Sequence, residues 1–196
     1  MSTGLALSIS LTGDGGEIPA RLLRVLSPER INPVIGQAAR NTYREHLFGL
    51  NSSRANRLGG KRTNYFAGAA RGTSWSATSD TVTVSINQVG IRQRVFGGKI
   101  TARTSKFLTI PACPEAYGKR AREFGDLKYI IFPKGGPALV RVTGKGDAAK
   151  LKVMYWLRRS ITQLPDPSVL PYPQLVLTRI HTAVSSTIDR AARRSS

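Results

Sequence analysis

The chain has 196 residues, of which 40% are hydrophobic, and carries 30 Lys and Arg residues against 11 Asp and Glu, a formal net charge of +19. This hydrophobic content is enough for a folded core and excludes a fully disordered chain, and no apolar run approaches the roughly 20 residues that cross a bilayer. The excess of positive charge predicts a polyanionic partner, either nucleic acid or an acidic protein surface.

The amino-terminal part is predicted to contain a strand and two helices. Residues 5–12 alternate Leu and Ile with small residues, which is the period of a half-buried strand, and residues 18–26 favour a short helix. A longer helix is expected from about Pro28 to Phe48, because Ser27 offers a capping hydroxyl and Pro28 suits the first helical position. The first residues lack the pattern of a signal peptide, so maturation in a cytoplasm is expected.

Residues 49–75 are predicted to form a long basic loop. The stretch is rich in Gly, Ser, Asn and Arg and has few large apolar residues. A loop of this length inside a compact domain has a function or is disordered. Its cations Arg54, Arg57, Lys61 and Arg62 are therefore candidates for contact with an anionic partner.

From residue 80 the pattern changes to strands. Residues 80–87 alternate Val and Ile with Thr and Ser, and residues 90–111 predict a basic β-arm that turns at the pair Gly97-Gly98. The cations of this arm are Arg92, Arg94, Lys99, Arg103 and Lys106. One interpretation is a solvated ribbon face; the other, which we favour, is an interface, because like charges on a two-stranded ribbon repel without a counter-surface.

The carboxy-terminal half predicts a meander followed by a helix. Apolar β-rich runs at 128–133, 138–143 and 150–157 are separated by Gly-containing turns. A helix is expected from Pro173 to Arg193, because its apolar residues recur at spacings of three and four. The order of elements predicts an α+β fold of two layers: one domain over residues 1–196 with an antiparallel sheet, N-terminal and C-terminal helices, and the basic loop and β-arm as extensions.

No catalytic, cofactor-binding or metal-binding grouping is recognisable, so the chain is expected not to be an enzyme and to need no cofactor. Gly97-Gly98-Lys99 lacks the Ser or Thr and the helix of a phosphate-binding loop. His46 and His181 are far apart, and Cys113 is the single cysteine, so no His/Cys metal site is predicted. Cys113 is expected to be a packed thiol.

The motif GIRQRVFGGKI…KFLTIPACPEAYGKRAREF, residues 90–124, resembles small virion-morphogenesis proteins of Mu-like long-tailed bacteriophages. The segment GGKRTNYFAGAA, residues 59–70, is similar to the same group, and so is MYWLRRSITQLPDPSVLPYPQL, residues 154–175, with the helix after it. The resemblance covers most of residues 20–190.

This resemblance implies a small twisted antiparallel sheet with the terminal helices packed on one face. It also implies a structural protein of the phage neck that forms a ring, joins tail to head or completes the tail, and has no enzymatic activity. The implied partners are other copies of the chain and portal-side or tail-tube proteins, with no membrane. The basic residues face either packaged double-stranded DNA in the lumen or an acidic neighbouring protein, and the sequence leaves both open. The implied location is the virion, after assembly in the host cytoplasm. The alternative is a stand-alone nucleic-acid-binding protein, which the charge favours and the lack of a binding motif disfavours.

Overall fold

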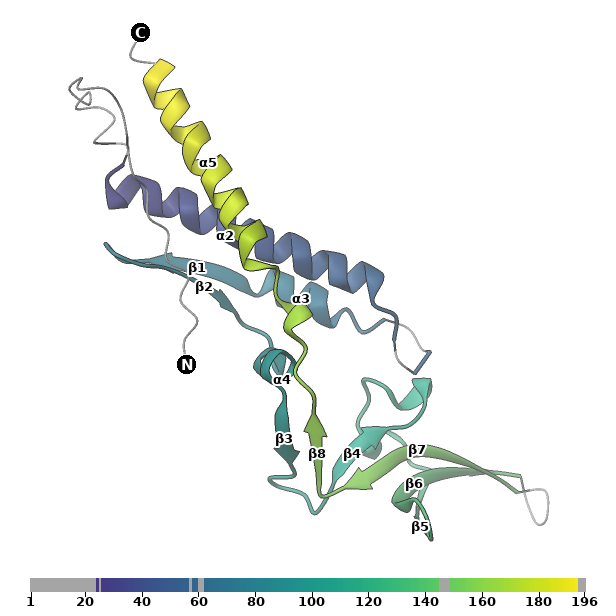
Figure 1. Cartoon of the computed structure of the whole chain (residues 1–196). Helices are drawn as coiled ribbons and strands as arrows, with labels where there is room; N and C mark the ends of the chain where they lie inside the picture. The colour runs from purple at the N-terminus through teal and green to yellow at the C-terminus, as the bar shows by residue number, and fades with distance from the viewer. Residues whose placement is uncertain (1–23, 25, 57, 60–61, 145–148, 194–196) are drawn as a thin grey trace. The chain divides into compact units, whose positions relative to one another are not determined.

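The computed structural model describes residues 24, 26–56, 58–59, 62–144 and 149–193 (Figure 1). The chain divides into two compact units, here called unit 1 (Met1–Leu50, Phe66–Ile91 and Pro167–Ser196) and unit 2 (Asn51–Tyr65 and Arg92–Asp166). The single domain over residues 1–196 expected from the sequence stays a prediction. The predicted strand over 5–12 and nearly all of the predicted helix over 18–26 lie outside the described residues.

Unit 1 is built from two long helices, a short helix and a two-stranded ribbon. Its elements are α2 (Pro28–Ser53, which enters unit 2 at Asn51), α3 (Tyr65–Arg71), β1 (Thr73–Ala77), β2 (Val82–Ile86) and α5 (Pro173–Arg193). The Ser27 carbonyl accepts the first helical hydrogen bonds, from the backbone N–H groups of Arg30 and Ile31. The predicted helices from Pro28 and over Pro173–Arg193 are confirmed, and α2 continues beyond the predicted end at Phe48.

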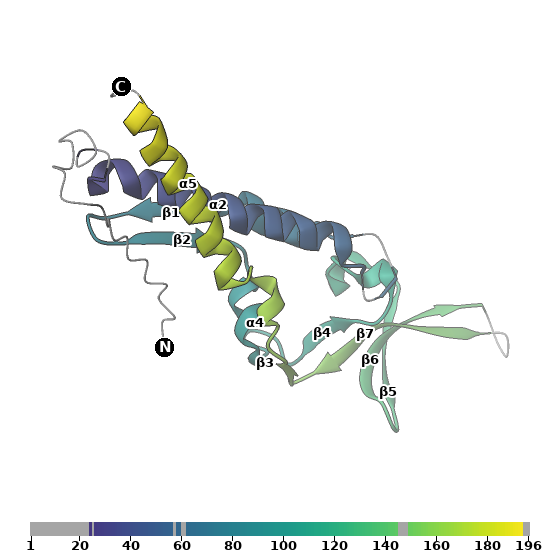
Figure 2. The ribbon, with the colours of Figure 1, turned by 45° about the horizontal axis from the view of Figure 1, so that its top comes forward.

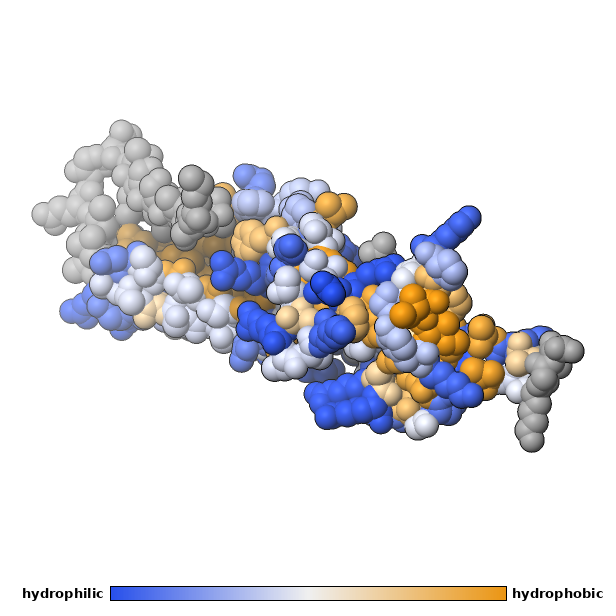
Figure 3. Space-filling view, turned by 90° about the horizontal axis from the view of Figure 1, so that it is seen from below, coloured by the Kyte–Doolittle hydropathy of each residue, from blue (hydrophilic) through white to orange (hydrophobic). Residues whose placement is uncertain are grey.

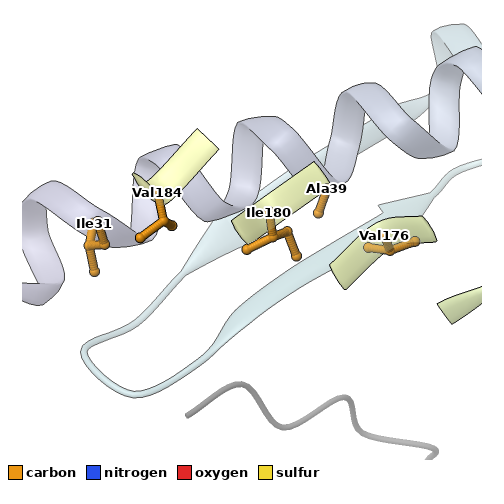
Figure 4. Close-up of a cluster of buried hydrophobic side chains, with 5 residues drawn as sticks. All are labelled: Ile31, Ala39, Val176, Ile180 and Val184. Carbon is orange, nitrogen blue, oxygen red and sulfur yellow. The ribbon is translucent and has the colours of Figure 1, made fainter. Parts of the chain in front are cut away.

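The core of unit 1 lies where α2 and α5 pack together. Ile31 and Ala39 of α2 and Val176, Ile180 and Val184 of α5 form one buried cluster (Figure 4). The spacing of four within α5 places its three residues on one helical face. Val84 of β2 packs against the same cluster, so the ribbon is attached to the helices by its apolar side.

The β1–β2 ribbon corrects the predicted loop over residues 49–75. That stretch contains the end of α2, all of α3 and the first three residues of β1, which pairs antiparallel with β2, with Trp75 opposite Val84. Phe66, Ala67, Ala69 and Ala70 of α3 are buried. The loop prediction failed because the small residues that permit close helix packing are also common in loops. The Ala residues were the helical signal, since Ala is the best helix former.

Unit 2 contains a four-stranded antiparallel sheet and a separate two-stranded one. The first has the order β4-β7-β6-β5 and the second pairs β3 with β8. The bounds are β3 Gly98–Thr101, β4 Leu108–Pro111, β5 Leu127–Phe132, β6 Gly136–Thr143, β7 Lys150–Arg158 and β8 Ser160–Gln163, with 3-10 turns η1 (Pro114–Ala116) and η2 (Ala121–Glu123). The predicted meander is confirmed: β5, β6 and β7 follow one another, with β6 and β7 as a long hairpin (Figure 2).

The core of unit 2 forms where the η1 and η2 turns cover one face of the sheet. Cys113, Ala116, Met154 and Tyr155 are buried together, and Phe124 packs against them. The Tyr155 hydroxyl lies 3.2 and 3.0 Å from the carbonyl oxygens of Ala116 and Lys119, which gives the buried phenol its hydrogen-bond partners. Cys113 is enclosed with its sulfur 3.5 Å from that of Met154, as expected of a packed thiol.

The predicted β-arm over 90–111 is wrong. Ile91–Phe96 forms a short helix, α4, β3 pairs with β8, and β4 pairs with β7, so the two sides of the Gly pair never meet as a ribbon. Gly97 has φ +67° and donates its N–H to the Gln93 carbonyl, which is how glycine ends a helix. A Cβ at Gly97 would also meet the Gln163 carbonyl oxygen at 2.6 Å.

The predicted α+β fold class is confirmed, since helices at both ends of the chain combine with antiparallel sheets. The architecture differs from the expected single sheet: the described strands form three small sheets, one in unit 1 and two in unit 2. The long helices pack on the ribbon of unit 1, whereas short turns cover the larger sheet of unit 2.

Two glycines of α2 give a matched test of this packing. A Cβ at Gly36 would collide with Cε3 and Cδ2 of Trp75, while one at Gly49 meets none of the described atoms within 4 Å. We expect Gly36→Ala to destabilise the protein by about 1–3 kcal/mol through overpacking, and Gly49→Ala to stabilise it by about 0.5–1 kcal/mol through helix propensity. Urea unfolding of the two variants measures both signs; a stabilising Gly36→Ala would contradict the packing of β1 on α2.

Candidate functional site

Positive charge is concentrated in unit 2. This unit contains 20 of the 30 Lys and Arg residues and 5 of the 11 acids, a net charge of +15, against +4 for unit 1. All nine cations singled out from the sequence fall in it. Its basic residues are Arg54, Arg57, Lys61, Arg62, Arg92, Arg94, Lys99, Arg103, Lys106, Lys119, Arg120, Arg122, Lys128, Lys134, Arg141, Lys145, Lys150, Lys152, Arg158 and Arg159.

The four described acids of unit 2 already have partners within the unit. The described ion pairs are Arg54–Asp166 at 2.6 Å, Arg141–Asp126 at 2.5 Å and Lys152–Glu115 at 2.7 Å. The Glu123 carboxylate accepts the Arg120 backbone N–H at 2.9 Å and so caps η2. Asp147 lies outside the described residues. Because the unit has 20 cations and 5 acids, most of its positive charge is not balanced within it, and the positive potential extends outward.

Two of the nine cations singled out from the sequence, Arg54 and Arg94, are held by contacts within unit 2. Arg54 Nη1 donates to Asp166 Oδ2, and the Asp166 backbone N–H donates to the Arg94 carbonyl at 2.9 Å. The Arg94 guanidinium stacks 4.3 Å from the centroid of the Tyr65 ring. Burial raises the pKa of the Tyr65 phenol, and the nearby Arg94 charge partly opposes the rise. We call Arg54, Tyr65, Arg94 and Asp166 the boundary clasp.

The boundary clasp gathers the four places where the chain enters or leaves unit 2. Tyr65 and Asp166 are the last residues before two of these crossings, and Arg54 and Arg94 come shortly after the other two. An ion pair with side chains about one-third exposed contributes at most about 1 kcal/mol by itself. Its effect here is to align segments that are distant in sequence, so these arginines are poor candidates for contact with a partner.

The other sequence candidates face solvent where the structure describes them. Arg62, Arg92, Lys99, Arg103 and Lys106 are exposed, and Arg57 and Lys61 lie outside the described residues. The cations of residues 90–111 do not form the single ribbon face expected from the sequence. Arg92 lies on α4, Lys99 on β3, and Arg103 and Lys106 in the turn before β4. The arrangement is a dispersed basic surface, which suits phosphate or carboxylate contact without base-specific readout.

Sequence reasoning missed the exposed apolar residues of β5. Tyr129 and Ile131 are 54% and 65% exposed, while Ile130 and Phe132 are partly buried. A signal was available: KYIIFP is apolar at successive positions, so both faces of the strand need cover. Tyr129 lies opposite Leu139, on the face that the core occupies, but Tyr129 and Ile131 remain exposed. This exposure marks a second surface beside the basic one.

No chemistry-bearing grouping is evident in the described part of the chain. None of the described residues form a group of three or more His, Cys, Asp or Glu side chains that could hold a metal ion. A groove on unit 1 is lined, among the described residues, by polar side chains of α5, including His181 and Asp189. These two are eight residues apart, about 12 Å along the helix axis, which is too far for an acid–base pair. Among the described residues, no helix has the length and apolarity required to cross a membrane.

The comparisons with known proteins give no relative: no protein-family model, curated protein or solved structure matches this chain. Its function is therefore argued from its own residues and from the sequence motifs described above.

Two ion pairs of unit 2 predict how stability depends on pH. The hydrogen bond from Lys152 lowers the pKa of Glu115, and the hydrogen bond from Arg141 lowers the pKa of Asp126. A carboxyl with a lowered pKa in the folded state gives stability that is present above its unfolded value, near 4.5 for Glu115 and 3.8 for Asp126, and lost as pH falls through the folded value.

We expect the urea midpoint to fall as pH drops below about 4.5, and to fall less in the Glu115→Gln/Asp126→Asn double variant. Unfolding curves between neutral and acid pH measure both slopes. Identical slopes in the variant and the parent protein would show that these pairs do not carry the acid sensitivity.

Proposed function

We propose that this chain is a structural subunit of the neck of a long-tailed bacteriophage, which assembles with other copies of itself into a ring and helps to join the tail to the head or to complete the tail. The observation that carries the proposal is the resemblance of residues 90–124 to virion-morphogenesis proteins. All but the first two of these residues belong to unit 2, which also holds two-thirds of the basic residues. One unit thus combines the motif and the charge.

The charge of unit 2 constrains such an assembly. Copies that approach one another through surfaces of net charge +15 repel, and at physiological salt this repulsion extends about 8 Å from the surface. A ring therefore requires either that unit 2 faces an anionic partner or that the copies meet through other surfaces. Packaged DNA in the lumen and acidic neighbouring neck proteins both meet the first condition.

A second candidate function, a stand-alone nucleic-acid-binding protein, is favoured by the same concentration of charge. The two candidates differ in what the isolated chain does. A nucleic-acid-binding protein binds duplex DNA as a monomer, with an affinity that falls steeply as salt is raised. A neck subunit works as part of an assembly and is recovered with the particle.

The proposal predicts that exposed cations of unit 2 are needed for particle assembly. We expect Arg92→Glu/Arg103→Glu to lower the titre of a complemented phage by at least about tenfold, because it replaces attraction to an anionic partner by repulsion. The matched control is Arg71→Glu/Arg193→Glu, which makes the same charge change at exposed positions of unit 1 and is expected to leave the titre near the parent value.

Mass spectrometry of the purified particles gives the second readout. Particles made with the parent and control proteins should contain the chain, and particles made with the unit 2 variant should lack it or be tailless. The neck assignment would be abandoned if infectious particles contained no trace of this chain. Equal titres for both double variants would remove the role given to the charge of unit 2.

A further inference from the structure

Strand β5 forms an open edge of the larger sheet of unit 2. It pairs along its whole length with β6, from Leu127 opposite Arg141 to Phe132 opposite Gly136. In the sheet order β4-β7-β6-β5 no described strand lies on its other side. Backbone N–H and C=O groups at such an edge are available to an added strand.

The same strand exposes apolar side chains beside this edge. Tyr129 and Ile131 are two residues apart, so they lie on one face, and both are more than half exposed. Figure 3 shows apolar residues gathered in an orange patch bordered by hydrophilic ones in blue. Natural edge strands usually carry charges, prolines or bulges that prevent pairing with another chain. Within β5 only Lys128 is such a residue.

The surroundings of β5 are positive. Lys128 lies on the strand and Lys134 in the turn after it, and neither is part of a described ion pair; Arg141, opposite the first residue of the strand, serves to balance a carboxylate. Asp126, the residue directly before β5, is held by Arg141 at 2.5 Å. Charge complementarity therefore favours an occupant with acidic side chains and disfavours a second copy of this basic unit.

Nucleic acid fits this surface less well than a protein strand. A duplex has no backbone amides to continue the sheet, and Ile131 offers neither a hydrogen bond nor an aromatic face on which a base could stack. An extended peptide uses all three features: the sheet edge, the apolar pair and the surrounding cations.

We propose that the outer edge of β5 binds an extended acidic segment of another protein, which adds to the sheet as a fifth strand and packs apolar side chains on Tyr129 and Ile131. Main-chain hydrogen bonds hold the segment, the apolar pair fixes its register, and the cations select for acidic residues. This interaction does not depend on the neck assignment, since it is argued from the edge, its exposure and its charge alone.

The test uses the full chain and a fluorescent eight-residue peptide of alternating Glu and Val, followed by anisotropy. We expect binding, and slower hydrogen exchange of the β5 amides in its presence. Two control peptides separate the contributions: Lys in place of Glu removes the charge match, and N-methylation of alternate amides removes the edge hydrogen bonds. Both are expected to bind at least about tenfold more weakly, a difference that corresponds to about 1.4 kcal/mol.

Variants of the chain test the contribution of Tyr129 and Ile131 to binding. Tyr129→Thr/Ile131→Thr keeps residues that suit a strand and is expected to weaken binding of the Glu–Val peptide by about tenfold or more. Leu151→Thr, at another exposed position of the same sheet, is the matched control and should bind like the parent chain. Circular dichroism of each variant establishes that the fold is kept.

Several results would overturn the proposal. These are no binding of the Glu–Val peptide at millimolar concentration, equal binding of the N-methylated peptide, or equal binding by the Tyr129→Thr/Ile131→Thr variant. Protection of β5 by a duplex DNA instead of the peptide would assign the surface to nucleic acid. A dimer in light scattering that dissociates in the same variant would assign it to a second copy.

Discussion

The ion pair between Arg54 and Asp166 joins the two separate stretches of chain from which unit 2 is made. It lies close to the points where the chain enters and leaves the unit. The pair contributes little energy of its own, since both side chains are partly exposed. Its value is geometric: the Asp166 backbone also bonds to Arg94, and Arg94 stacks on Tyr65, so residues at or near the four ends of the two stretches meet in one cluster.

This use of arginine divides the basic residues into two kinds. Arg54 and Arg94 are committed to the boundary clasp, and Arg141 and Lys152 to ion pairs on the sheet. The exposed remainder gives unit 2 a positive surface that its few acids do not neutralise. A free-standing protein with this charge is kept apart from its own copies, whereas an assembly that places it against anions is stabilised. This difference between a free and an assembled chain links the charge of unit 2 to the proposed place in a phage particle.

The sequence predicted the elements that local periodicity controls. The helix over Pro173–Arg193 and the β5–β7 meander have long, regular apolar patterns, and the fold class follows from their order. Residues 91–96 are too few to separate a period of 3.6 from a period of two, and the partner of β3 is β8, about sixty residues later, which no local pattern reveals. The roles of Arg54 and Arg94 were hidden for the same reason, since Asp166 is far from both in sequence. The exposed pair on β5 was visible in the composition of the strand but not its open edge.

The most direct measurement for the account as a whole is a density map of the neck of the particle made by the phage that is proposed to encode this chain. The account predicts several copies in a closed ring at the joint between head and tail, with unit 2 of each copy turned toward DNA or toward an acidic neighbouring protein. It is contradicted by a map in which every neck and tail density is filled by other chains. It is also contradicted by one in which unit 2 faces open solvent throughout the ring.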